Sequence, residues 1–546
     1  MSLPSNVKHE SWILLLQEII DSKTLGSRNL NELEIQRIEN LKKLFELGVN
    51  PYPAEAFQVT HFANPIKENF KEENADQYQY VRLAGRIMAI RGKGKASFAE
   101  LQDQTGRIQL YVGQDNICPT EDKTLYEEVF KKLVDIGDYL GVEGYVFITK
   151  MGEISIHVSS FTFLSKAIRT LPIVKTDAEG KVYDAFLNPE LRYRMRYVDL
   201  TVNPAFRNIF ITRSRVISEM RKYFDNQGWL EVETPILQAI HGGAAARPFQ
   251  THHNTLDTDL FLRIANELYL KRLIVAGFDG VYEIGKMFRN EGMDRTHNPE
   301  FTSMEIYVAY KDYIWMMGMV EELLEKITTV VHGKTAIEIR KQMGKEFTTH
   351  TVDFKGPYEK LSIYDAIKKH SGHDVSNMDE LALRNLCKNL GIEVDPSMGR
   401  GKLIDEIFGE TTEANLIQPT FITDYPIEMT PLAKKHRSKE GLVERFELFV
   451  MGKEIANAYT ELNDPIDQRA RFAEQLRLAE RGDDEAMSMD EDFLRALEFG
   501  MPPSSGLGIG IDRLTMLMTD QTTIQEVLFF PQMKPEVKVE ESNTEN

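Results

Sequence analysis

The chain has 546 residues, of which 42% are hydrophobic and 10% aromatic, and its formal net charge is −19. This length and composition can supply two or three hydrophobic cores, and the acidic balance excludes a protein that coats nucleic acid over its whole surface. No apolar run reaches the roughly 18 residues that span a bilayer, and the early stretch SWILLLQEII is expected to form an amphipathic or buried helix rather than a signal. Cys118 and Cys387 lie too far apart in sequence to suggest a disulfide framework or a thiolate zinc site, which favours a cytoplasmic protein.

The first part of the chain predicts a helix and then a small β-barrel. Residues 28–50 repeat apolar positions at helical spacing and end at Gly48, before the prolines of NPYP. From Tyr80 short alternating runs follow, in the order YVRLAGRIMAI, KASFAELQD, GRIQLYV, the helical LYEEVFKKLVDI, DYLGVEGYVFIT and EISIHVSSFTFL. Three strands, one helix and two strands is the order of an OB-type barrel, whose open face binds single-stranded nucleic acid. Another small β-barrel would give the same pattern.

The second part predicts an α+β domain built on an antiparallel β-sheet flanked by helices. A long helix is expected in AFRNIFITRSRVISEMRKYFDNQGW and a strand in LEVETPIL, and strands and helices then alternate irregularly to about residue 531. The resulting division is an extension (1–27), a helix and linker (28–60), the OB-type barrel (61–170), a linker (171–200), the α+β domain (201–533) and a polar tail expected to be disordered (534–546).

A charge cluster lies in FRNEGMDRTHNPEF, residues 288–301, which predicts a hairpin with a polar loop. Alternation along a strand places Arg289 and Glu291 on one face of the first arm, and Phe301, Glu305 and Tyr307 on one face of the second. A guanidinium, carboxylates and flat rings on one surface suit a nucleotide, with its phosphates on arginine and its base on Phe301. A half-solvated hairpin crossed by salt bridges is the alternative.

A second motif, GLGIGIDRLTML, predicts a glycine-alternating strand followed by an apolar helix, with Arg513 at the junction. Such a strand lets a ligand or another backbone approach closely. No βαβ unit surrounds it and no GK[ST] follows, which excludes a Rossmann fingerprint and a P-loop. Tight packing alone would also explain the glycines.

A third motif, RFELFVMGKEIANAYTELND, predicts another hairpin, with a turn near Gly452. The turn brings Glu447 and Glu454 to diagonal positions across the pair, close enough to share one or more Mg²⁺ ions. Two acids so placed repel one another unless a cation lies between them. An exposed acidic hairpin is the alternative.

The outgoing arm of that hairpin presents three polar groups on one face. Asn457, Tyr459 and Glu461 share this face by the period of two, and the group suits a polar, cationic ligand. Strict alternation places Glu454 on the opposite face. If all of these residues serve one site, the strand must therefore bulge near Ala456.

These pieces behind an OB-like barrel resemble class II aminoacyl-tRNA synthetases, a family with three signature motifs. The family's first motif resembles the long helix and the strand that ends in GWLEVETPIL, with Pro235 in the expected place, its second resembles FRNEGMDRTHNPEF, and its third resembles GLGIGIDRL. The stretches HGGAAARPF, THHN, ELYLKRL and FITDYP narrow the resemblance to the lysine-specific family of subclass IIb, in its bacterial form. The resemblance covers residues 30–533, and residues 1–27 match nothing recognised. The HIGH and KMSKS signatures of class I enzymes are missing from the sequence.

The resemblance implies a lysine–tRNA ligase reaction: L-lysine and ATP give lysyl-adenylate and pyrophosphate, and lysine then passes to the 3′ end of tRNA(Lys). It also implies Mg²⁺, more than one ion per active site, no membrane, and a homodimer through the helix before Gly228 and the strand to Leu237. Carried over position by position, it implies Arg289 and Arg513 as catalytic residues on the phosphates, Glu291 and His297 near adenine and phosphate, and Phe301 under adenine. The resemblance further implies that Glu447 binds both ATP and Mg²⁺ and that Glu454 is a second metal ligand. The implied lysine-binding residues are Gly243, Glu267, Glu305, Tyr307, Asn457, Tyr459 and Glu461. The implied anticodon-binding residues are Phe98, Gln109 and Glu153.

Four positions depart from the family pattern: Asn266 where proline is expected, Ala456 and Ala458 where glycine is expected, and Tyr459 where phenylalanine is expected. None removes a charge, so the departures are expected to alter only the shape of the lysine pocket. An aspartate or asparagine enzyme is the nearest rival, but its pocket should present a cation. A paralogue that modifies an elongation factor would lack the barrel. A nucleic-acid-binding protein with a decayed catalytic domain would lack the arginines and paired acids found here.

Overall fold

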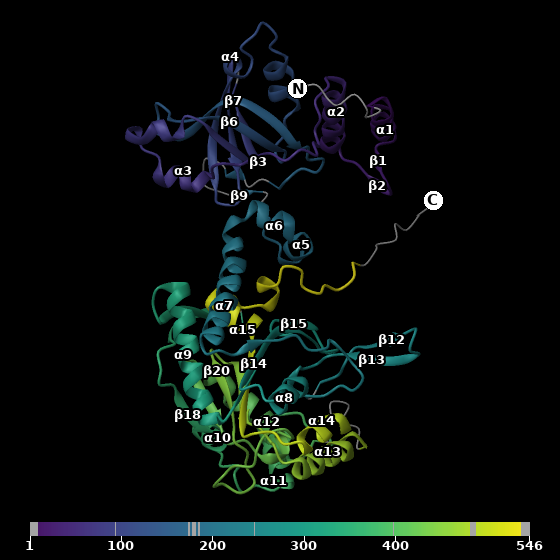
Figure 1. The fold of residues 1–546 in the computed structure, drawn as a ribbon, viewed down its shortest axis with the longest axis vertical. Helices are drawn as coiled ribbons and strands as arrows, with labels where there is room; N and C mark the ends of the chain where they lie inside the picture. The colour runs from purple at the N-terminus through teal and green to yellow at the C-terminus, as the bar shows by residue number, and fades with distance from the viewer. Residues whose placement is uncertain are drawn as a thin grey trace. The chain divides into compact units, whose positions relative to one another are not determined.

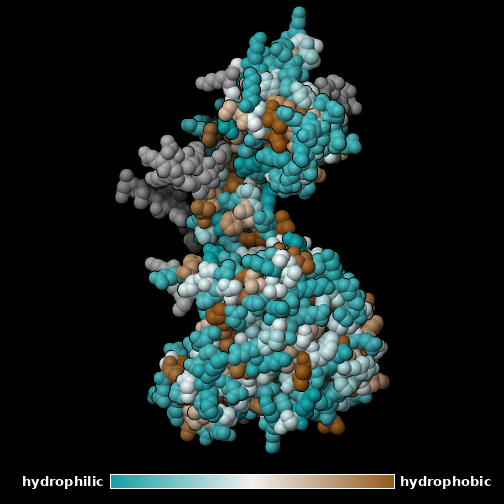
Figure 2. Space-filling model, turned by 90° about the vertical axis from the view of Figure 1, so that its left-hand side faces the viewer, coloured by the Kyte–Doolittle hydropathy of each residue, from teal (hydrophilic) through white to brown (hydrophobic). Residues whose placement is uncertain are grey.

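The computed structural model describes residues 9–536 except 93, 173–174, 177–181, 184–185, 245, 345, 397 and 481–486. The chain divides into two compact units, Met1–Phe186 and Leu187–Asn546. Among the described residues, no helix is both long and apolar enough to cross a membrane. The face shown in Figure 2 is largely hydrophilic, with small and separated hydrophobic patches.

The first unit begins with two packed helices, α1 (His9–Ser22) and α2 (Glu32–Glu46), joined by the short hairpin of β1 (Thr24–Leu25) and β2 (Arg28–Asn29). Leu16 of α1 packs with Leu41 of α2, while Trp12 is half exposed, which confirms the expected amphipathic helix. Asn31 and Glu34 form a capping box that fixes the start of α2.

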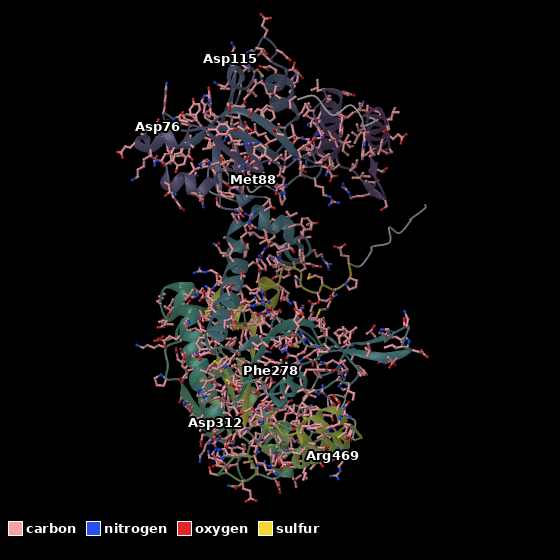
Figure 3. All side chains as sticks on the ribbon, viewed as in Figure 1. Asp76, Met88, Asp115, Phe278, Asp312 and Arg469 are labelled. Atoms are coloured by element: carbon pink, nitrogen blue, oxygen red, sulfur yellow. The ribbon has the colours of Figure 1, made fainter. Side chains whose placement is uncertain are left out.

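The barrel closes in the strand order β3-β4-β5-β7-β6 and confirms the OB-type order of elements. Its inner face is apolar, as the alternation of each strand requires. The strands are β3 (Val81–Arg91), β4 (Ala96–Gln102), β5 (Arg107–Gly113), β6 (Tyr139–Ile148) and β7 (Ile154–Ser165), with short helical segments α3 (Ala63–Asn69), η1 (Glu72–Tyr78), α4 (Gln114–Ile117) and the π-type η2 (Leu125–Leu133). Figure 1 shows the barrel with α3 and α4 beside it, and Asp115 of α4 is labelled in Figure 3.

The stretch expected to be a linker, 171–200, contains ordered elements at both ends. Two-residue strands β8 (Lys175–Thr176) and β9 (Val182–Tyr183) pair in the first unit, and helices α5 (Pro189–Arg194) and α6 (Arg196–Val202) belong to the second. Buried Asp199 accepts hydrogen bonds from Arg192 and Arg196, and Glu526 also binds Arg192. These ion pairs join α5 and α6 to each other and to Glu526 within the second unit.

The second unit is built on an eight-stranded sheet in the order β10-β14-β15-β22-β21-β20-β19-β18. Its central pairs are antiparallel and its two edge pairs are parallel, which confirms the expected antiparallel core of an α+β domain. The strands are β10 (Leu230–Glu231), β14 (Gly280–Phe288), β15 (Glu300–Ala309), β18 (Glu359–Ser362), β19 (Thr420–Thr423), β20 (Arg445–Val450), β21 (Lys453–Thr460) and β22 (Ser504–Gly510).

Helices cover one face of this sheet and leave a cavity on the other. The covered face packs against α7 (Arg207–Asn226), α9 (Tyr313–His332) and α15 (Ile511–Met518), of which α7 and α9 run side by side in Figure 1. Along β15, Met304 and Ile306 enter this core, so Glu305 and Tyr307 point to the opposite face. Asp312, labelled in Figure 3, caps α9 by accepting a hydrogen bond from the Trp315 amide.

The remaining elements of this unit are helices, short helical turns and hairpins. They are α8 (Glu267–Val275), α10 (Ile363–Ser371), α11 (Glu380–Leu390), α12 (Arg400–Thr411), α13 (Pro465–Glu480), α14 (Glu491–Glu498), the short η3 (Pro204–Phe206), η4 (Glu413–Asn415), η5 (Ile427–Met429) and η6 (Ile524–Val527), the sheet β11-β13-β12 (Leu237–Gln238, Thr258–Leu262, Gln250–His253) and the hairpin β16–β17 (Ala336–Met343, Glu346–Asp353).

The strand expected over residues 230–237 is much shorter in the structure. Leu230 and Glu231 pair with β14, and pairing of a different sheet begins at Leu237. The outer edge of β10 ends the eight-stranded sheet. A strand with a partner along one edge only is held by fewer hydrogen bonds, so the prediction of a continuous strand is wrong for the single chain. The predicted tail lies outside the described residues from 537 onwards.

Candidate active site

A cavity of about 970 Å³ opens on the uncovered face of the sheet in the second unit. Its floor is formed by the glycines of β22, at positions 506, 508 and 510, between the side chains of β15 and β21. The cavity brings together residues from all three sequence motifs. The predicted ATP, metal and lysine residues that line it are Gly243, Glu267, Arg289, Glu291, His297, Phe301, Glu305, Tyr307, Glu447, Glu454, Asn457, Tyr459 and Arg513. Glu461 lies buried beneath the floor, with Oε1 directed at Gly506.

The charged hairpin places a buried cation at the cavity wall. β14 ends at Phe288, so Arg289 lies in the loop rather than on the strand as predicted, and its amide donates to the Pro299 carbonyl at 2.9 Å. The Arg289 guanidinium lies 5.1 Å from the centroid of the Phe301 ring. Its Nε is buried without a hydrogen-bond partner, and burial lowers the pKa of Arg289. A buried guanidinium with an unpaired donor favours a further acceptor, such as a phosphate or carboxylate oxygen.

A hydrogen bond from His297 connects the loop of this hairpin to the strand–helix junction at Arg513. His297 binds Asp294 through Nδ1 at 2.8 Å and Arg513 through Nε2 at 3.1 Å. Arg513 also donates to the backbone carbonyl of Glu454 at 3.0 Å and forms an ion pair with its carboxylate at 3.2 Å. The charged hairpin and the GLGIGIDRLTML motif are therefore joined at the cavity, with Arg289 and Arg513 both lining it.

The acidic hairpin contains the bulge that its sequence requires. Met451 and Gly452 both have left-handed φ angles, 57° and 69°, and form the turn. Leu448 pairs with Ala456 and Phe449 pairs with Glu454, so Ile455 is the extra residue. The bulge turns Glu454 to the cavity face while Ile455 and Ala456 both enter the core. The prediction of a bulge near Ala456 is confirmed.

The cavity is strongly acidic around Glu447. Burial raises the pKa of Glu447 to about 7, the neighbouring Arg445 lowers it, and Glu454 and Asp405 raise it further. Tyr425 donates a hydrogen bond to Glu447 at 2.8 Å, and Arg445 forms an ion pair with it. Arg445 and Asp405 line the cavity but were missed by the sequence analysis. The spacing of Arg445 and Glu447 could have revealed Arg445, because residues two apart on a strand share a face.

The carboxylates of Glu447 and Glu454 supply only part of a Mg²⁺ site. Within the described ranges, no three acidic, histidine or cysteine side chains are grouped closely enough to hold a metal ion. Glu447 and Glu454 nevertheless both face the cavity. Mg²⁺ is commonly held by one or two carboxylates together with phosphate oxygens and water, so two carboxylates suffice where a nucleotide supplies the rest.

The deepest part of the site contains an ammonium group that the sequence analysis missed. Lys271 of α8 is fully buried, its Nζ lies 2.5 Å from Glu267 Oε1, and it also forms an ion pair with Glu461. Tyr459 donates a hydrogen bond to the same oxygen of Glu267 at 2.6 Å. The i, i+4 spacing of Glu267 and Lys271 is a helical ion-pair pattern that could have revealed this contact.

Glu305 is a third carboxylate of this region, after Glu267 and Glu461, and it accepts a hydrogen bond from Tyr307 at 3.0 Å. Burial raises the pKa of Glu305 to about 8, and the nearby charge of Glu267 adds to the effect. A Cβ added at Gly506 would lie 2.3 Å from Glu461 Oε1 and 2.4 Å from the Tyr307 ring. Glycine at this position therefore leaves room for the Glu461 carboxylate and the Tyr307 ring.

Two of the four departures from the family pattern lie away from the pocket. Ala456 and Ala458 are buried in the core on the other face of the sheet. The expectation that they alter the shape of the lysine pocket is therefore wrong. Asn266 donates a hydrogen bond at 3.0 Å to Glu283, beneath the pocket. Tyr459 does line the cavity, and its hydroxyl binds Glu267. Its departure therefore adds a hydrogen bond inside the site.

The three residues predicted to read an anticodon lie on the outside of the barrel in the first unit. Phe98 of β4 is 37% exposed, and Gln109 of β5 donates a hydrogen bond to Ser155 at 3.0 Å. Glu153 lies in the turn that joins β6 and β7, 3.7 Å from the ammonium of Lys67. Gln109 pairs with Ser155, two residues beyond Glu153, so the three positions occupy neighbouring rows of one surface.

Comparison with known proteins agrees with both units. Residues 188–534 match the family model of class II tRNA synthetases (D, K and N), and residues 81–164 match that of the OB-fold nucleic acid binding domain. The chain therefore belongs to the class II tRNA synthetases of the D, K and N group. It is 60% identical over 508 residues to a lysine–tRNA ligase of Porphyromonas gingivalis, covering 93% of this chain and 86% of the relative. It is 58% identical over 518 residues (95% and 89%) to that of Christiangramia forsetii, and 55% identical over 507 residues (93% and 99%) to that of Azobacteroides pseudotrichonymphae.

Proposed function

We propose that this chain is a lysine–tRNA ligase, which activates L-lysine with ATP and transfers it to tRNA(Lys) in the cytoplasm. The observation that carries the proposal is the balance of buried charge in the cavity. Of three buried carboxylates, Glu267 and Glu461 share the ammonium of Lys271, whereas Glu305 lies near Glu267 and Arg289. Buried charges require partners. The acids outnumber the ammonium of Lys271, and a lysine molecule carries two ammonium groups that can pair with them.

The positions of the acids also orient the substrate. Glu305 interacts with Arg289, whereas Glu267 and Glu461 lie with Lys271 at the deep end. Glu305 would accept the α-ammonium, and the deep pair would accept the ε-ammonium. The carboxylate of lysine then points to Arg289, where a further acceptor is favoured. Asn457 and Gly243 complete the walls.

Activation follows from this placement. A lysine carboxylate oxygen attacks the α-phosphorus of ATP, the new P–O bond forms as the bond to pyrophosphate breaks, and no proton moves. Because negative charge accumulates at phosphorus, the site must supply fixed cations rather than a base. Arg289 and Arg513 supply them, Phe301 stacks on adenine, and Glu291 and His297 hold the loop around the nucleotide. Glu447 and Glu454 would hold Mg²⁺, more than one ion being expected, and the metal would neutralise phosphate charge.

In the transfer step, the terminal ribose hydroxyl of the tRNA attacks the lysyl carbonyl carbon, and AMP leaves with the electrons of the C–O bond. A phosphate oxygen of the adenylate can accept the hydroxyl proton. On the barrel, Phe98 would stack on an anticodon base while Gln109 and Glu153 hydrogen-bond to base edges.

A homodimer through the first motif is part of the proposal. Ile211 of α7 and Leu230, Ile236 and Leu237 of the following segment are large apolar side chains that are 45–56% exposed. The adjoining edge of β10 ends the sheet of the single chain. An apolar surface beside an unpaired strand edge suits a second copy of the same surface.

The test is amino-acid-dependent ATP–pyrophosphate exchange with each of the twenty amino acids. Exchange with lysine alone, abolished in Arg289→Ala, is the expected result. Exchange with aspartate or asparagine would overturn the assignment of the pocket. An aspartate side chain would need a cation, whereas Lys271 is already paired with two carboxylates.

A further inference from the structure

A single row of side chains crosses every strand of the barrel in the first unit. The cross-strand pairs continue from one strand to the next without a break, as Arg91 on β3, Phe98 on β4, Tyr111 on β5, His157 on β7 and Tyr145 on β6. Residues that pair directly across strands lie on the same face of a sheet. The row therefore presents one guanidinium and four rings on the outer surface.

The rings of this row touch one another in sequence. The centroids of Phe98 and Tyr111 are 5.4 Å apart, and those of Tyr111 and His157 are 5.1 Å apart. His157 and Tyr145 stack in parallel at 4.6 Å with an angle of 11°. Phe147 flanks the row, 5.7 Å from His157. The four rings of the row span three strand spacings of about 4.8 Å each, or roughly 14 Å.

The fold does not require these rings on the outside. The neighbouring residues of the same strands, including Ala99, Leu110, Ile156 and Val146, fill the interior of the barrel. Phe98 and Tyr145, near the two ends of the row, are each 37% exposed. Large rings left at the surface of a closed, filled barrel are available to a ligand.

The chemistry of the row favours nucleic acid bases over an apolar peptide. The next row of the same face carries Glu100, Gln109 and Ser155, with Phe147 at its β6 end, so polar groups border the rings over β4, β5 and β7. Rings with an adjacent arginine are the usual stacking surface for unpaired bases. The row also includes Phe98 and adjoins Gln109, and it lies within the range that matches OB-fold nucleic acid binding domains.

We propose that Tyr145 and His157 form a further stacking subsite, for an unpaired nucleotide of the tRNA that adjoins the anticodon. The proposal rests on the proposed function, in which Phe98 and Gln109 contact the anticodon. One base on Phe98 occupies one end of the row, which leaves the other end for a neighbouring nucleotide of the loop. The subsite selects an exposed base with its stacking face and does not read its hydrogen-bonding edge.

The test measures binding of the full-length protein to a short anticodon stem-loop RNA of tRNA(Lys). The RNA is prepared intact, with an abasic nucleotide just 5′ or just 3′ of the anticodon, and with an abasic middle anticodon position. For the unaltered protein, one of the two flanking abasic RNAs should bind about tenfold more weakly than the intact RNA, the scale of one base–aromatic stack.

Protein variants identify the ring responsible. Tyr145→Leu should weaken binding of the intact RNA about tenfold, yet should cause no further loss with that flanking abasic RNA. Tyr145→Phe should bind like the unaltered protein, because it keeps the ring. Tyr139→Leu is the matched control, since Tyr139 lies on the same strand, is 39% exposed and stands outside the row. It should bind normally.

Failure of this subsite is distinguishable from failure of anticodon binding. If Phe98→Leu and the abasic middle position weaken binding while both flanking abasic RNAs bind normally to the unaltered protein, the subsite is overturned and anticodon binding stands. The comparison of the abasic RNAs uses the unaltered protein and needs no variant to fold. If Phe98→Leu and the abasic anticodon have no effect, the proposed anticodon contact itself fails. An equal effect of Tyr145→Leu on every RNA would also contradict the subsite.

Discussion

The side-chain ammonium of Lys271 lies 2.5 Å from a carboxylate oxygen of Glu267, and both groups are buried. Lys271 also pairs with Glu461, so one internal cation holds two acids of the proposed lysine pocket. Removing one partner of such a buried cluster leaves an uncompensated charge, at a cost of about 3–5 kcal/mol. Lys271 is therefore a positioning residue for the carboxylates.

The first prediction concerns this ammonium. Lys271→Met should raise the KM for lysine about 100-fold or more, because protonation of Glu267 or Glu461 replaces the lost cation and weakens the acceptor for the ε-ammonium. The KM for ATP should change little. Lys286→Met is the control, since Lys286 forms only an exposed ion pair with Glu300 at 3.3 Å. A folded Lys271→Met enzyme with an unchanged KM for lysine would contradict the role.

The second prediction is a pH dependence that arises from Glu305. Its pKa is raised to about 8 from an ordinary value of 4.5, chiefly by burial. Below pH 8 the carboxyl is mostly neutral, so binding an ammonium must release a proton and is weaker at lower pH. The KM for lysine should fall about tenfold for each pH unit between 6 and 7. Glu305→Gln should bind lysine poorly and show no such slope.

The same shift makes a prediction for stability without substrate. A carboxyl whose pKa is raised by folding stabilises the folded state below its unfolded pKa, and that contribution is lost as pH rises towards the folded value. The lysine-free protein should therefore lose stability between about pH 4.5 and 8 in part through Glu305. Thermal melting of Glu305→Gln should show a smaller loss across this range than the unaltered protein.

The third prediction uses two glycines of one strand. Gly506→Ala would place a Cβ 2.3 Å from the Glu461 carboxylate and 2.4 Å from the Tyr307 ring, whereas Gly508→Ala would meet its nearest atom at 3.7 Å. Gly506→Ala should lower Tm by several degrees and raise the KM for lysine at least about tenfold, because a buried acid must move. Gly508→Ala should leave the Tm of the substrate-free protein nearly unchanged. Equal melting of the two variants would contradict this account.

The fourth prediction concerns Mg²⁺. Chelation with EDTA should abolish exchange, and added Mg²⁺ should restore it. Glu454→Gln should raise the Mg²⁺ concentration for half-maximal exchange about tenfold, since one of two carboxylate ligands is lost. Glu440→Gln, an exposed change of the same kind, is the control. If Glu454→Gln shows the same Mg²⁺ dependence as the unaltered enzyme, the metal is held elsewhere.

Alternation along strands carried most of the sequence prediction. It placed Glu305 and Tyr307 together, and it required a bulge near Ala456, found at Ile455, because Glu454 has the wrong parity to share a face with Asn457. The same rule, applied to Ala456 and Ala458, would have placed both in the core rather than near the pocket. Motifs whose residues are close in sequence are predictable because local geometry fixes their faces.

Contacts between distant elements could not be predicted in this way. Lys271 and Glu461 are far apart in sequence although they form an ion pair, and the burial of Lys271 depends on how α8 packs against the sheet. The segment after α7 reads as a strand, but whether it pairs depends on a neighbour along its outer edge. Asp405 reaches the cavity from α12, which no motif of the sequence marks.

The most direct test of the central claim, that the buried acids select lysine, is aminoacylation of total tRNA with labelled lysine, aspartate or asparagine. The account predicts that lysine alone is attached, to tRNA(Lys), and that Glu461→Gln reduces this at least about 100-fold, because the deep acceptor for the ε-ammonium is lost. Attachment of aspartate or asparagine, or unchanged lysine attachment by Glu461→Gln, would contradict it.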